Sequence, residues 1–319
     1  MLSSVANVSS AHQVDLSVQV GALRFANPIL TAAGTFGYGV EFAHLVDLNR
    51  LGGVVTKGIS KEPIEGAPAP RVHETASGMV NAVGLQNIGV EGFVRDKLPL
   101  LRKYNTHLIV NVFGYCLDEY AEVIRRLEGV EGISAYELNI SCPNVKKGGM
   151  QFGGDPSLVS EVVGTARKAG PSRPLWVKLT PLVTDIGLIA RAAVEGGADV
   201  LTVANTYPAL CVDVRTGRSV LGNGTGGLSG PAIRPITLRL VWEVWKAVRV
   251  PVIGLGGVET AADVLEYGMV GASAVQVGTA SFADPRASEK IIEGLPQELE
   301  KVKARSFREM TGKFQADNG

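Results

Sequence analysis

Glu137-Leu138-Asn139-Ile140-Ser141-Cys142-Pro143-Asn144 is the most informative segment of this chain. Residues 135–140 look like a short buried strand, in which an asparagine is unusual because an unpaired buried amide costs about 1–3 kcal/mol. Proline ends a central strand, so Cys142 is expected where the strand becomes a loop. Enzymes built from alternating strands and helices place reacting groups at such positions. A lone cysteine more often fills a packed turn, but the two neighbouring asparagines favour a functional thiol.

The composition indicates a soluble globular protein. The 319 residues are 45% hydrophobic and 19% charged with a formal net charge of zero, so no basic excess points to nucleic acid. No apolar run approaches the roughly 20 residues of a membrane span. Residues 1–13 lack the cationic start and the apolar core of a signal peptide. We expect a cytoplasmic protein in which residues 1–14 form a flexible tail.

The three cysteines, Cys116, Cys142 and Cys211, lie far apart and form no Cys-x-x-Cys pair. We therefore expect no metal site, and neither structural zinc nor an iron–sulfur cluster held by this chain alone. Widely spaced thiols suit a reducing compartment. Cys116 and Cys211 are expected to be packing or surface residues.

Strand and helix patterns alternate along most of the chain. A hairpin is predicted in residues 15–25, ahead of the main fold. Helices are predicted at residues 90–101, 117–127, 157–168 and 233–248; Asp185 and a Thr260/Asp263 capping box begin two more. Eight apolar segments are predicted to be buried strands, at residues 29–33, 53–56, 108–112, 135–140, 175–177, 200–204, 251–255 and 274–277.

This alternation predicts an α/β protein with a (β/α)8 TIM barrel, because near-continuous apolar strands indicate a parallel sheet covered on both faces. Residues 1–319 are predicted to form one domain, with the N-terminal β-hairpin and inserted loops at the C-terminal face. The insertions are residues 58–88, which have little helical period, and the glycine-rich residues 217–230. An open doubly wound sheet is the alternative, although no Gly-x-Gly-x-x-Gly follows the first strand.

Polar or glycine residues stand at the C-terminal ends of seven predicted strands. A single buried lysine is usually part of a structural ion pair, but seven such strand ends in a barrel would converge on one mouth, where active sites lie. The residues are Lys57, Asn111, Asn139, Lys178, Asn205-Thr206, Gly256-Gly257 and Gly278-Thr279.

The last predicted units carry three sets of glycines, in residues 226–230, 256–257 and 278–279. Glycines also serve ordinary turns, yet loops after the last two strands of such barrels commonly bind phosphate through backbone N–H groups. Lys57 and Lys178 would add positive charge, and the asparagines suit a planar heterocycle. A phosphate, a planar ring and a nearby thiol together indicate a flavin mononucleotide (FMN) enzyme.

On these motifs the chain resembles the class 1 dihydroorotate dehydrogenases, class 1B most closely, from residue 27 to about residue 285. The most specific match is Asn139 to Asn144, where class 1 has the catalytic cysteine and class 2 has serine. Further matches are residues 56–58, 81–87, 177–180, 205–206 and 226–230, and residues 145–149 look like class 1B. At Ala33 related enzymes often have serine, so only a backbone contact to the flavin is expected there.

The resemblance implies oxidation of (S)-dihydroorotate to orotate in de novo pyrimidine biosynthesis, with Cys142 as the base and FMN as the hydride acceptor. Lys178 would stabilise negative charge on the reduced flavin. The implied substrate-binding residues are Lys57, Asn81, Ala82, Val83, Gly84, Leu85, Asn139, Asn144, Asn205 and Thr206. The implied cofactor-binding residues are Ala33, Lys57, Gly58, Asn111, Asn139, Lys178, Ala204, Gly230, Gly256, Gly257, Gly278 and Thr279.

Class 1B also implies a homodimeric core that binds an electron-transfer subunit with FAD and a [2Fe–2S] cluster, forming a heterotetramer that reduces NAD⁺. This chain has no cluster motif and no dinucleotide fingerprint of its own. The alternatives are a class 1A-like homodimer that uses fumarate, a dihydropyrimidine or tRNA-dihydrouridine reductase, and a flavin-binding barrel without catalysis. The neutral net charge argues against tRNA.

Overall fold

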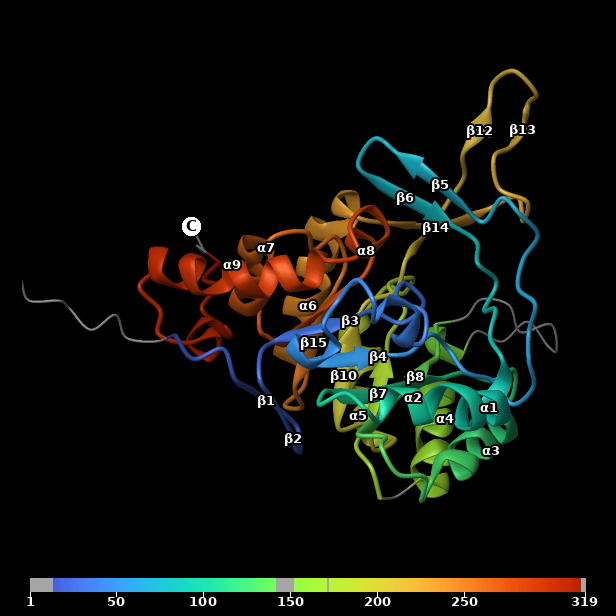
Figure 1. Ribbon diagram of the computed structural model, residues 1–319, viewed down its shortest axis with the longest axis horizontal. Coiled ribbons are helices and arrows are strands. Elements are labelled where there is room, and N and C mark those ends of the chain that lie inside the picture. The colour runs from blue at the N-terminus through green and yellow to red at the C-terminus, as the bar shows by residue number, and fades with distance from the viewer. Residues whose placement is uncertain (1–13, 142–151, 171, 317–319) are drawn as a thin grey trace, which may run out of the picture.

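The computed structural model describes residues 14–141, 152–170 and 172–316. Eight strands in this part of the chain close into a parallel barrel, ordered β10-β15-β16-β3-β4-β7-β8-β9 (Figure 1). Each of the eight predicted strands coincides with one of these, so the predicted (β/α)8 barrel is confirmed. The strands are β3 (Ile29–Thr31), β4 (Gly53–Val55), β7 (His107–Val112), β8 (Ala135–Asn139), β9 (Leu175–Lys178), β10 (Val200–Val203), β15 (Val252–Leu255) and β16 (Ala272–Val277).

The barrel strands are apolar on both faces because one face meets the interior and the other meets the helices. All five residues of β8 and all four of β9 are buried. Their parallel register pairs Glu137 with Trp176 and Asn139 with Lys178. Parallel pairing brings the carboxyl ends of the strands to one rim, which is why polar groups from distant parts of the sequence meet there.

The predicted helices are present, with caps where the sequence places them. Asp185 accepts a hydrogen bond from the Leu188 amide at 3.0 Å, and Thr260 and Asp263 form the predicted capping box. The helices are α1 (Gly89–Gly92), α2 (Leu98–Leu101), α3 (Leu117–Leu127), α4 (Pro156–Ala169), α5 (Ile186–Glu195), α6 (Arg234–Ala247), α7 (Ala261–Met269), α8 (Ala280–Ala283) and α9 (Ala287–Lys301). Short 3₁₀ turns are η1 (Val40–Phe42), η2 (Leu48–Arg50), η4 (Phe152–Gly154), η5 (Pro231–Ile233) and η6 (Phe307–Met310).

Two helical regions differ from expectation. The helix predicted at residues 90–101 is divided by the π-helical turn η3 (Phe93–Lys97). Pro99 follows that turn and has no N–H to donate, which accounts for the irregular hydrogen bonding before it. Helix α9 is not among the predicted elements; it buries Ile291, Leu295 and Leu299 on one face.

Three β-structures lie outside the barrel in the described part of the chain. The predicted N-terminal hairpin is confirmed as β1 (Val18–Val20) and β2 (Leu23–Phe25). A four-stranded antiparallel sheet, which we call the capping sheet, lies on the opposite side of the barrel (Figure 1). Its strands, in order, are β11 (Tyr207–Ala209), β14 (Gly226–Ser229), β6 (Gly78–Asn81) and β5 (Val72–Thr75).

The capping sheet corrects the prediction that residues 58–88 and 217–230 are loops. Strand β6 pairs with β14, which follows it by about 150 residues, so the pairing partner is invisible in local sequence. The glycines of β14 permit this pairing, because a Cβ on Gly226 would lie 2.6 Å from the Asn81 carbonyl oxygen. A smaller hairpin, β12 (Val212–Asp213) with β13 (Arg218–Ser219), projects beyond the sheet (Figure 1).

The N-terminal tail is predicted over residues 1–14, and residues 1–13 lie outside the described part of the chain. Val14 packs against the core, and the Asp15 amide donates to the Arg305 carbonyl oxygen at 3.0 Å. The prediction is therefore wrong for residue 14, because this segment pairs with the C-terminal region. Among the described residues, none of the helices combines the length and apolar character needed to cross a bilayer.

Candidate active site

The interior of the barrel holds a hydrogen-bonded group of four side chains, which we call the polar layer. It consists of Asn111, Glu137, Thr202 and Gln276, each 0% exposed. The Glu137 carboxylate accepts from Asn111 Nδ2 at 2.8 Å, from Thr202 Oγ1 at 2.8 Å and from Gln276 Nε2 at 2.7 Å. A buried carboxylate needs this many donors, because burial removes its water.

Lys178 ends β9 just above this layer and is 5% exposed. In the strand register it lies beside Asn139 of β8 and Thr202 of β10. Desolvation lowers the pKa of the Lys178 ammonium group, and the charge of Glu137 opposes that shift. Among the described residues no carboxylate oxygen lies within 4.0 Å of Lys178 Nζ. The buried cation is therefore available to a bound anion or polar ring.

The ends of β8 and β10 are joined by side-chain hydrogen bonds. Ser141 Oγ donates to Asn139 Oδ1 at 2.8 Å, and Asn205 Nδ2 donates to Ser141 Oγ. Asn205 Oδ1 in turn accepts from the Thr206 amide at 2.8 Å. These contacts bring three predicted substrate-binding residues together on one side of the mouth. Cys142 and Asn144 lie outside the described residues.

Lys57 and Gly58 follow β4 on the other side of the mouth. The Lys57 amide donates to the Gly37 carbonyl oxygen at 2.8 Å, which fixes the backbone. The half-buried Lys57 side chain has a lowered pKa, mainly because of desolvation; Glu41 opposes this shift and Arg71 adds to it. A Cβ on Gly58 would lie 3.2 Å from Asn111 Oδ1, so the bare backbone of Gly58 faces the Asn111 amide.

Asn81, at the end of β6, connects the capping sheet to the strand ends of the barrel. Asn81 Nδ2 donates to the Gly227 carbonyl oxygen at 3.1 Å. A Cβ on Gly227 would overlap Thr206 Oγ1, so Gly227 must be bare for Thr206 and Asn81 to lie on either side of it. The predicted substrate residues Asn81, Asn205 and Thr206 thus belong to one connected group.

The segment after Asn81 is held by its backbone. The Ala82 amide donates to the Arg71 carbonyl oxygen at 2.7 Å, and the Val83 carbonyl oxygen accepts from the Ala67 amide at 3.0 Å. Gly84 and Leu85 both have positive φ, 74° and 60°. A positive φ is unusual for leucine and indicates a backbone shaped by its surroundings. Leu85 and Gly84 therefore form a fixed turn at the mouth.

Glycines from three successive units pack close together at the rim, in a group that we call the glycine cradle. A Cβ on Gly257 would lie 2.7 Å from the Gly230 carbonyl oxygen, and a Cβ on Gly230 would lie 3.5 Å from Thr279 Cγ2. Gly230, Gly256 and Gly257 have φ of 96°, 148° and 69°, which L-residues rarely adopt. Gly278 precedes Thr279 at the end of β16. This glycine cradle is the predicted phosphate region, and the structure brings its members together.

The two remaining predicted residues follow β3 and β10, which β15 and β16 separate around the barrel. Ala33 is half-buried just after β3, and its side chain carries no polar atom. Ala204 is 2% exposed, and its amide donates to the Leu255 carbonyl oxygen at 3.1 Å. At both positions a ligand could be contacted by backbone or by apolar surface only.

Sequence reasoning missed three members of the polar layer, namely Glu137, Thr202 and Gln276. A signal was present: a carboxylate and an amide inside otherwise apolar strands need buried partners. Each of the three stands two residues before a predicted cofactor residue, Asn139, Ala204 or Gly278. Positions i and i+2 of a strand share a face, so the polar layer lies directly beneath the predicted flavin contacts.

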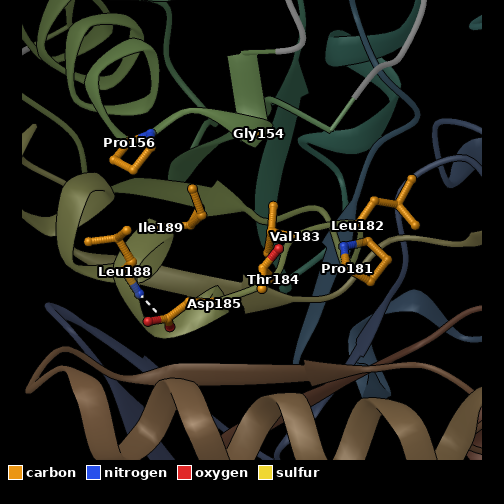
Figure 2. A pocket seen from close by; sticks show the side chains of 9 residues that line it. All are labelled: Gly154, Pro156, Pro181, Leu182, Val183, Thr184, Asp185, Leu188 and Ile189. Carbon is orange, nitrogen blue, oxygen red and sulfur yellow. Dashed lines mark hydrogen bonds between the residues drawn. The ribbon is translucent and has the colours of Figure 1, made fainter.

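A separate pocket of about 600 Å³ lies outside this group. Figure 2 shows that the loop after β9 and the starts of α4 and α5 line it. Its wall mixes apolar side chains with polar groups, and Asp185 there is engaged in capping α5. None of the predicted site residues in the described chain lines this pocket, so we do not assign the site to it.

Comparison with known proteins is in line with this arrangement. A family model described as dihydroorotate dehydrogenase matches residues 15–299. The chain is 50% identical to a protein of Thermodesulfovibrio yellowstonii, over 94% of this chain and 98% of that protein. A protein of Trichlorobacter lovleyi is 52% identical over 89% of this chain and 93% of its own length. Both are named dihydroorotate dehydrogenase B (NAD⁺), catalytic subunit.

A third relative carries a different name. A protein of Solibacter usitatus is 53% identical over 93% of this chain and 97% of its own length. Its provisional name is dihydroorotate dehydrogenase A (fumarate). The relatives therefore agree on the dehydrogenase and differ on the electron acceptor. With the family match spanning nearly the whole barrel, the chain belongs to the dihydroorotate dehydrogenase family of oxidoreductases.

Proposed function

We propose that this chain oxidises (S)-dihydroorotate to orotate in de novo pyrimidine biosynthesis, with FMN as its cofactor. The observation that carries the proposal is the meeting of Lys57, Asn81, Asn139, Lys178 and Asn205 around one barrel mouth. These residues come from five separate parts of the sequence, and the family match supplies the reaction. We also propose a cytoplasmic location, because the widely spaced cysteines suit a reducing compartment.

The residues present fit FMN. Asn111 Oδ1 is buried without a hydrogen-bond partner in the described residues, and it faces bare Gly58. Lys178 offers a buried positive charge. The cradle of Gly230, Gly256, Gly257, Gly278 and Thr279 presents backbone to a phosphate with no Cβ in the way. Ala33, Lys57, Gly58, Asn111, Asn139, Lys178 and Ala204 would hold the ring and ribityl chain.

The chain's own residues would bind the substrate and accept one proton from it. Asn81, Asn139, Asn205 and Asn144 present amides that can bind the planar ring and its carboxylate. Lys57 adds positive charge, and Thr206 with residues 82–85 would complete the substrate site. Cys142 takes the C5 proton of dihydroorotate as its thiolate, becoming a neutral thiol. When bound, FMN supplies the acceptor for the hydride that leaves C6.

Lys178 has a second task in this scheme. The hydride brings two electrons into the site, and the C5 proton goes elsewhere, to Cys142. A fixed buried cation offsets the negative charge that results, and Lys178 forms no direct ion pair within 4.0 Å in the described residues that would neutralise it.

The decisive experiment measures cofactor and chemistry together. Purified protein is expected to be yellow with about one FMN per chain, because each barrel has one glycine cradle to bind the FMN phosphate. Anaerobic dihydroorotate should then bleach the visible band in a single turnover. A colourless protein that fails to bind added FMN would contradict the cofactor assignment. A yellow protein that dihydroorotate does not bleach would contradict the substrate assignment and favour a dihydropyrimidine or dihydrouridine reductase, or a barrel without catalysis.

The proposed electron acceptor is NAD⁺, reached through a partner subunit. Two of the relatives above are named catalytic subunits of NAD⁺-dependent enzymes. We propose a homodimeric core with a partner carrying FAD and a [2Fe–2S] cluster bound to each barrel, giving a heterotetramer. This chain has no cluster motif with which to build the relay itself. Alone, it should reduce dyes with dihydroorotate and reduce NAD⁺ poorly.

Direct use of fumarate is the second candidate, favoured by the name of the Solibacter usitatus relative. The isolated chain is assayed with dihydroorotate and either NAD⁺ or fumarate, with and without a candidate partner. NAD⁺ reduction that requires the partner supports the first proposal. Rapid fumarate turnover by the isolated chain, with no gain from the partner, would replace it and leave the assignments of FMN and Cys142 intact.

A further inference from the structure

We propose that Glu137 is a positioning residue for the FMN site, acting through Asn111 and Lys178. It would hold the Asn111 amide in one orientation and supply the negative charge that faces the Lys178 ammonium group. This inference rests on the proposed function, because it concerns residues assigned to the cofactor. Glu137 itself touches neither substrate nor cofactor in this scheme.

The orientation argument begins with hydrogen-bond chemistry. An ionised carboxylate only accepts hydrogen bonds, and an amide can present either NH₂ or oxygen. Glu137 Oε1 lies 2.8 Å from Asn111 Nδ2. The reversed amide would place two oxygens against each other at that distance, in a fully buried site. Glu137 therefore holds the Asn111 NH₂ group as its hydrogen-bond donor, and Asn111 Oδ1 points away from the carboxylate.

The freed oxygen is the group that a ligand would meet. Asn111 Oδ1 is buried and unpartnered among the described residues, and it faces the Cα of Gly58. Gln276 shows the same pattern: its Nε2 donates to Glu137 and its Oε1 has no partner there. A ligand with an N–H donor suits such an oxygen, and the flavin ring carries one in its imide.

The charge argument concerns Lys178. Asn111, Thr202 and Gln276 are neutral, so Glu137 is the charged member of the polar layer beneath Lys178. Desolvation lowers the Lys178 pKa, and Glu137 acts against that shift. Removing the carboxylate should therefore leave Lys178 easier to deprotonate. Because no carboxylate of the described residues lies within 4.0 Å of Lys178 Nζ, the effect of Glu137 is exerted through space rather than by a direct ion pair.

Three variants separate these roles from simple structural support. Glu137→Gln removes the charge and lets the Asn111 amide reverse. Glu137→Asp keeps the charge but is too short to preserve the 2.8 Å contact with Asn111. Thr202→Val is the matched control, because it removes another donor to Glu137 and leaves both the charge and the Asn111 contact in place. Each variant is measured for thermal unfolding, for FMN affinity by fluorescence quenching, and for the pH dependence of flavin reduction.

We expect both Glu137 variants to bind FMN about tenfold more weakly, the loss of roughly one oriented hydrogen bond. Thr202→Val should stay within about threefold of wild type in FMN affinity. The alkaline limb of flavin reduction should move to lower pH in Glu137→Gln and stay in place in Glu137→Asp and Thr202→Val. A purely structural role would shift melting temperature and FMN affinity together in all three variants and leave the alkaline limb unmoved, which would overturn the proposal.

The controls keep this inference distinct from the proposed function. Wild type that binds no FMN contradicts the proposed function itself. Wild type that binds FMN normally, together with Glu137 variants that bind it equally well, overturns the role of Glu137 alone. If Glu137→Gln does not fold, unchanged FMN affinity in Glu137→Asp is sufficient to overturn the orientation role.

Discussion

The polar layer and the capping sheet serve the same barrel mouth by different physical means. The four side chains of the polar layer are wholly buried and are held by hydrogen bonds between side chains. In the capping sheet Asn81 and Gly227 are only half-buried, and backbone pairing between distant segments holds them. We call the polar layer with Lys178 the lower region and the capping sheet the upper region. Burial fixes the lower region rigidly, whereas the upper region depends on a few close backbone contacts. We therefore expect substitutions in the lower region to weaken FMN binding and substitutions in the upper region to weaken substrate binding.

The largest effect is expected for Cys142, the residue proposed to act on the substrate itself. Cys142→Ala removes the proposed base and should lower the rate of flavin reduction by about 10²–10⁴. FMN content and orotate binding should remain at wild-type levels, because neither the polar layer nor the capping sheet is altered. Stopped-flow reduction by dihydroorotate measures the rate. Near-normal reduction would mean that another group takes the proton.

Lys178→Ala tests the lower region. Loss of one interaction with a charged group costs about 1.5–3 kcal/mol, so FMN affinity should fall by roughly 10- to 100-fold. Flavin reduction should slow as well, and the KM for dihydroorotate should change much less. Equilibrium dialysis and stopped-flow kinetics provide the two readouts. An unchanged FMN affinity together with an unchanged reduction rate would remove Lys178 from the site.

The charge of Lys178 also predicts a pH dependence. A free thiol has a pKa of about 8.5, so activity should first rise as Cys142 ionises. The lysine pKa lies below its ordinary 10.5. The positive charge is thus present at low pH and is lost as pH rises through that lowered value, which gives a second, falling limb. Lys178→Arg, which stays charged, should abolish the falling limb; a limb that persists in this variant belongs to another group.

Gly227→Ala tests the upper region. The added methyl group would overlap Thr206 Oγ1 and disturb the contact with Asn81. We expect the KM for dihydroorotate to rise about tenfold, the loss of roughly one hydrogen bond, while FMN affinity stays unchanged. Gly164→Ala in α4 is the control, because its nearest neighbour would be 3.8 Å away. Weaker FMN binding with a normal KM for dihydroorotate would contradict the expectation that the capping sheet serves the substrate rather than FMN.

The smallest effect is expected at Ala33, where the class pattern often has serine. Ala33→Ser restores a hydroxyl at a half-buried rim position. One added neutral hydrogen bond at this partly exposed position should tighten FMN binding by about two- to threefold, the lower end of the roughly 0.5–1.5 kcal/mol that such bonds contribute. Fluorescence titration measures this change. Weaker binding would show that the alanine is needed to make room for the ligand.

Much of the site could be predicted because it lies at the ends of barrel strands. Lys57, Asn139, Lys178 and Gly278 each follow or end an apolar segment, and a parallel barrel gathers such ends at one rim. Their convergence required only the recognition of eight strands in order. Asn81 was predicted in a different way. Local pattern indicated only a loop in residues 58–88, and Asn81 was assigned to the site from the family resemblance.

The pairing within the polar layer could not be predicted from local pattern. Glu137 and Gln276 stand out as polar residues in apolar strands, but Glu137, Thr202 and Gln276 are separated by up to 139 positions, so the sequence does not show which residues pair. Only the closure of the barrel brings them within hydrogen-bond distance. The same holds for the capping sheet, whose strands β6 and β14 pair across about 150 residues.

Local sequence was sufficient to predict the order of the barrel strands and of most helices, the helix caps, and the strand ends at which the mouth residues lie. These depend on local periodicity, on capping side chains and on the rule that parallel strands end together. Tertiary structure alone decided which buried polar groups pair, how the Asn111 amide is oriented and where the capping sheet forms. Those outcomes depend on distances between residues far apart in the chain, and such distances exist only after the barrel has closed.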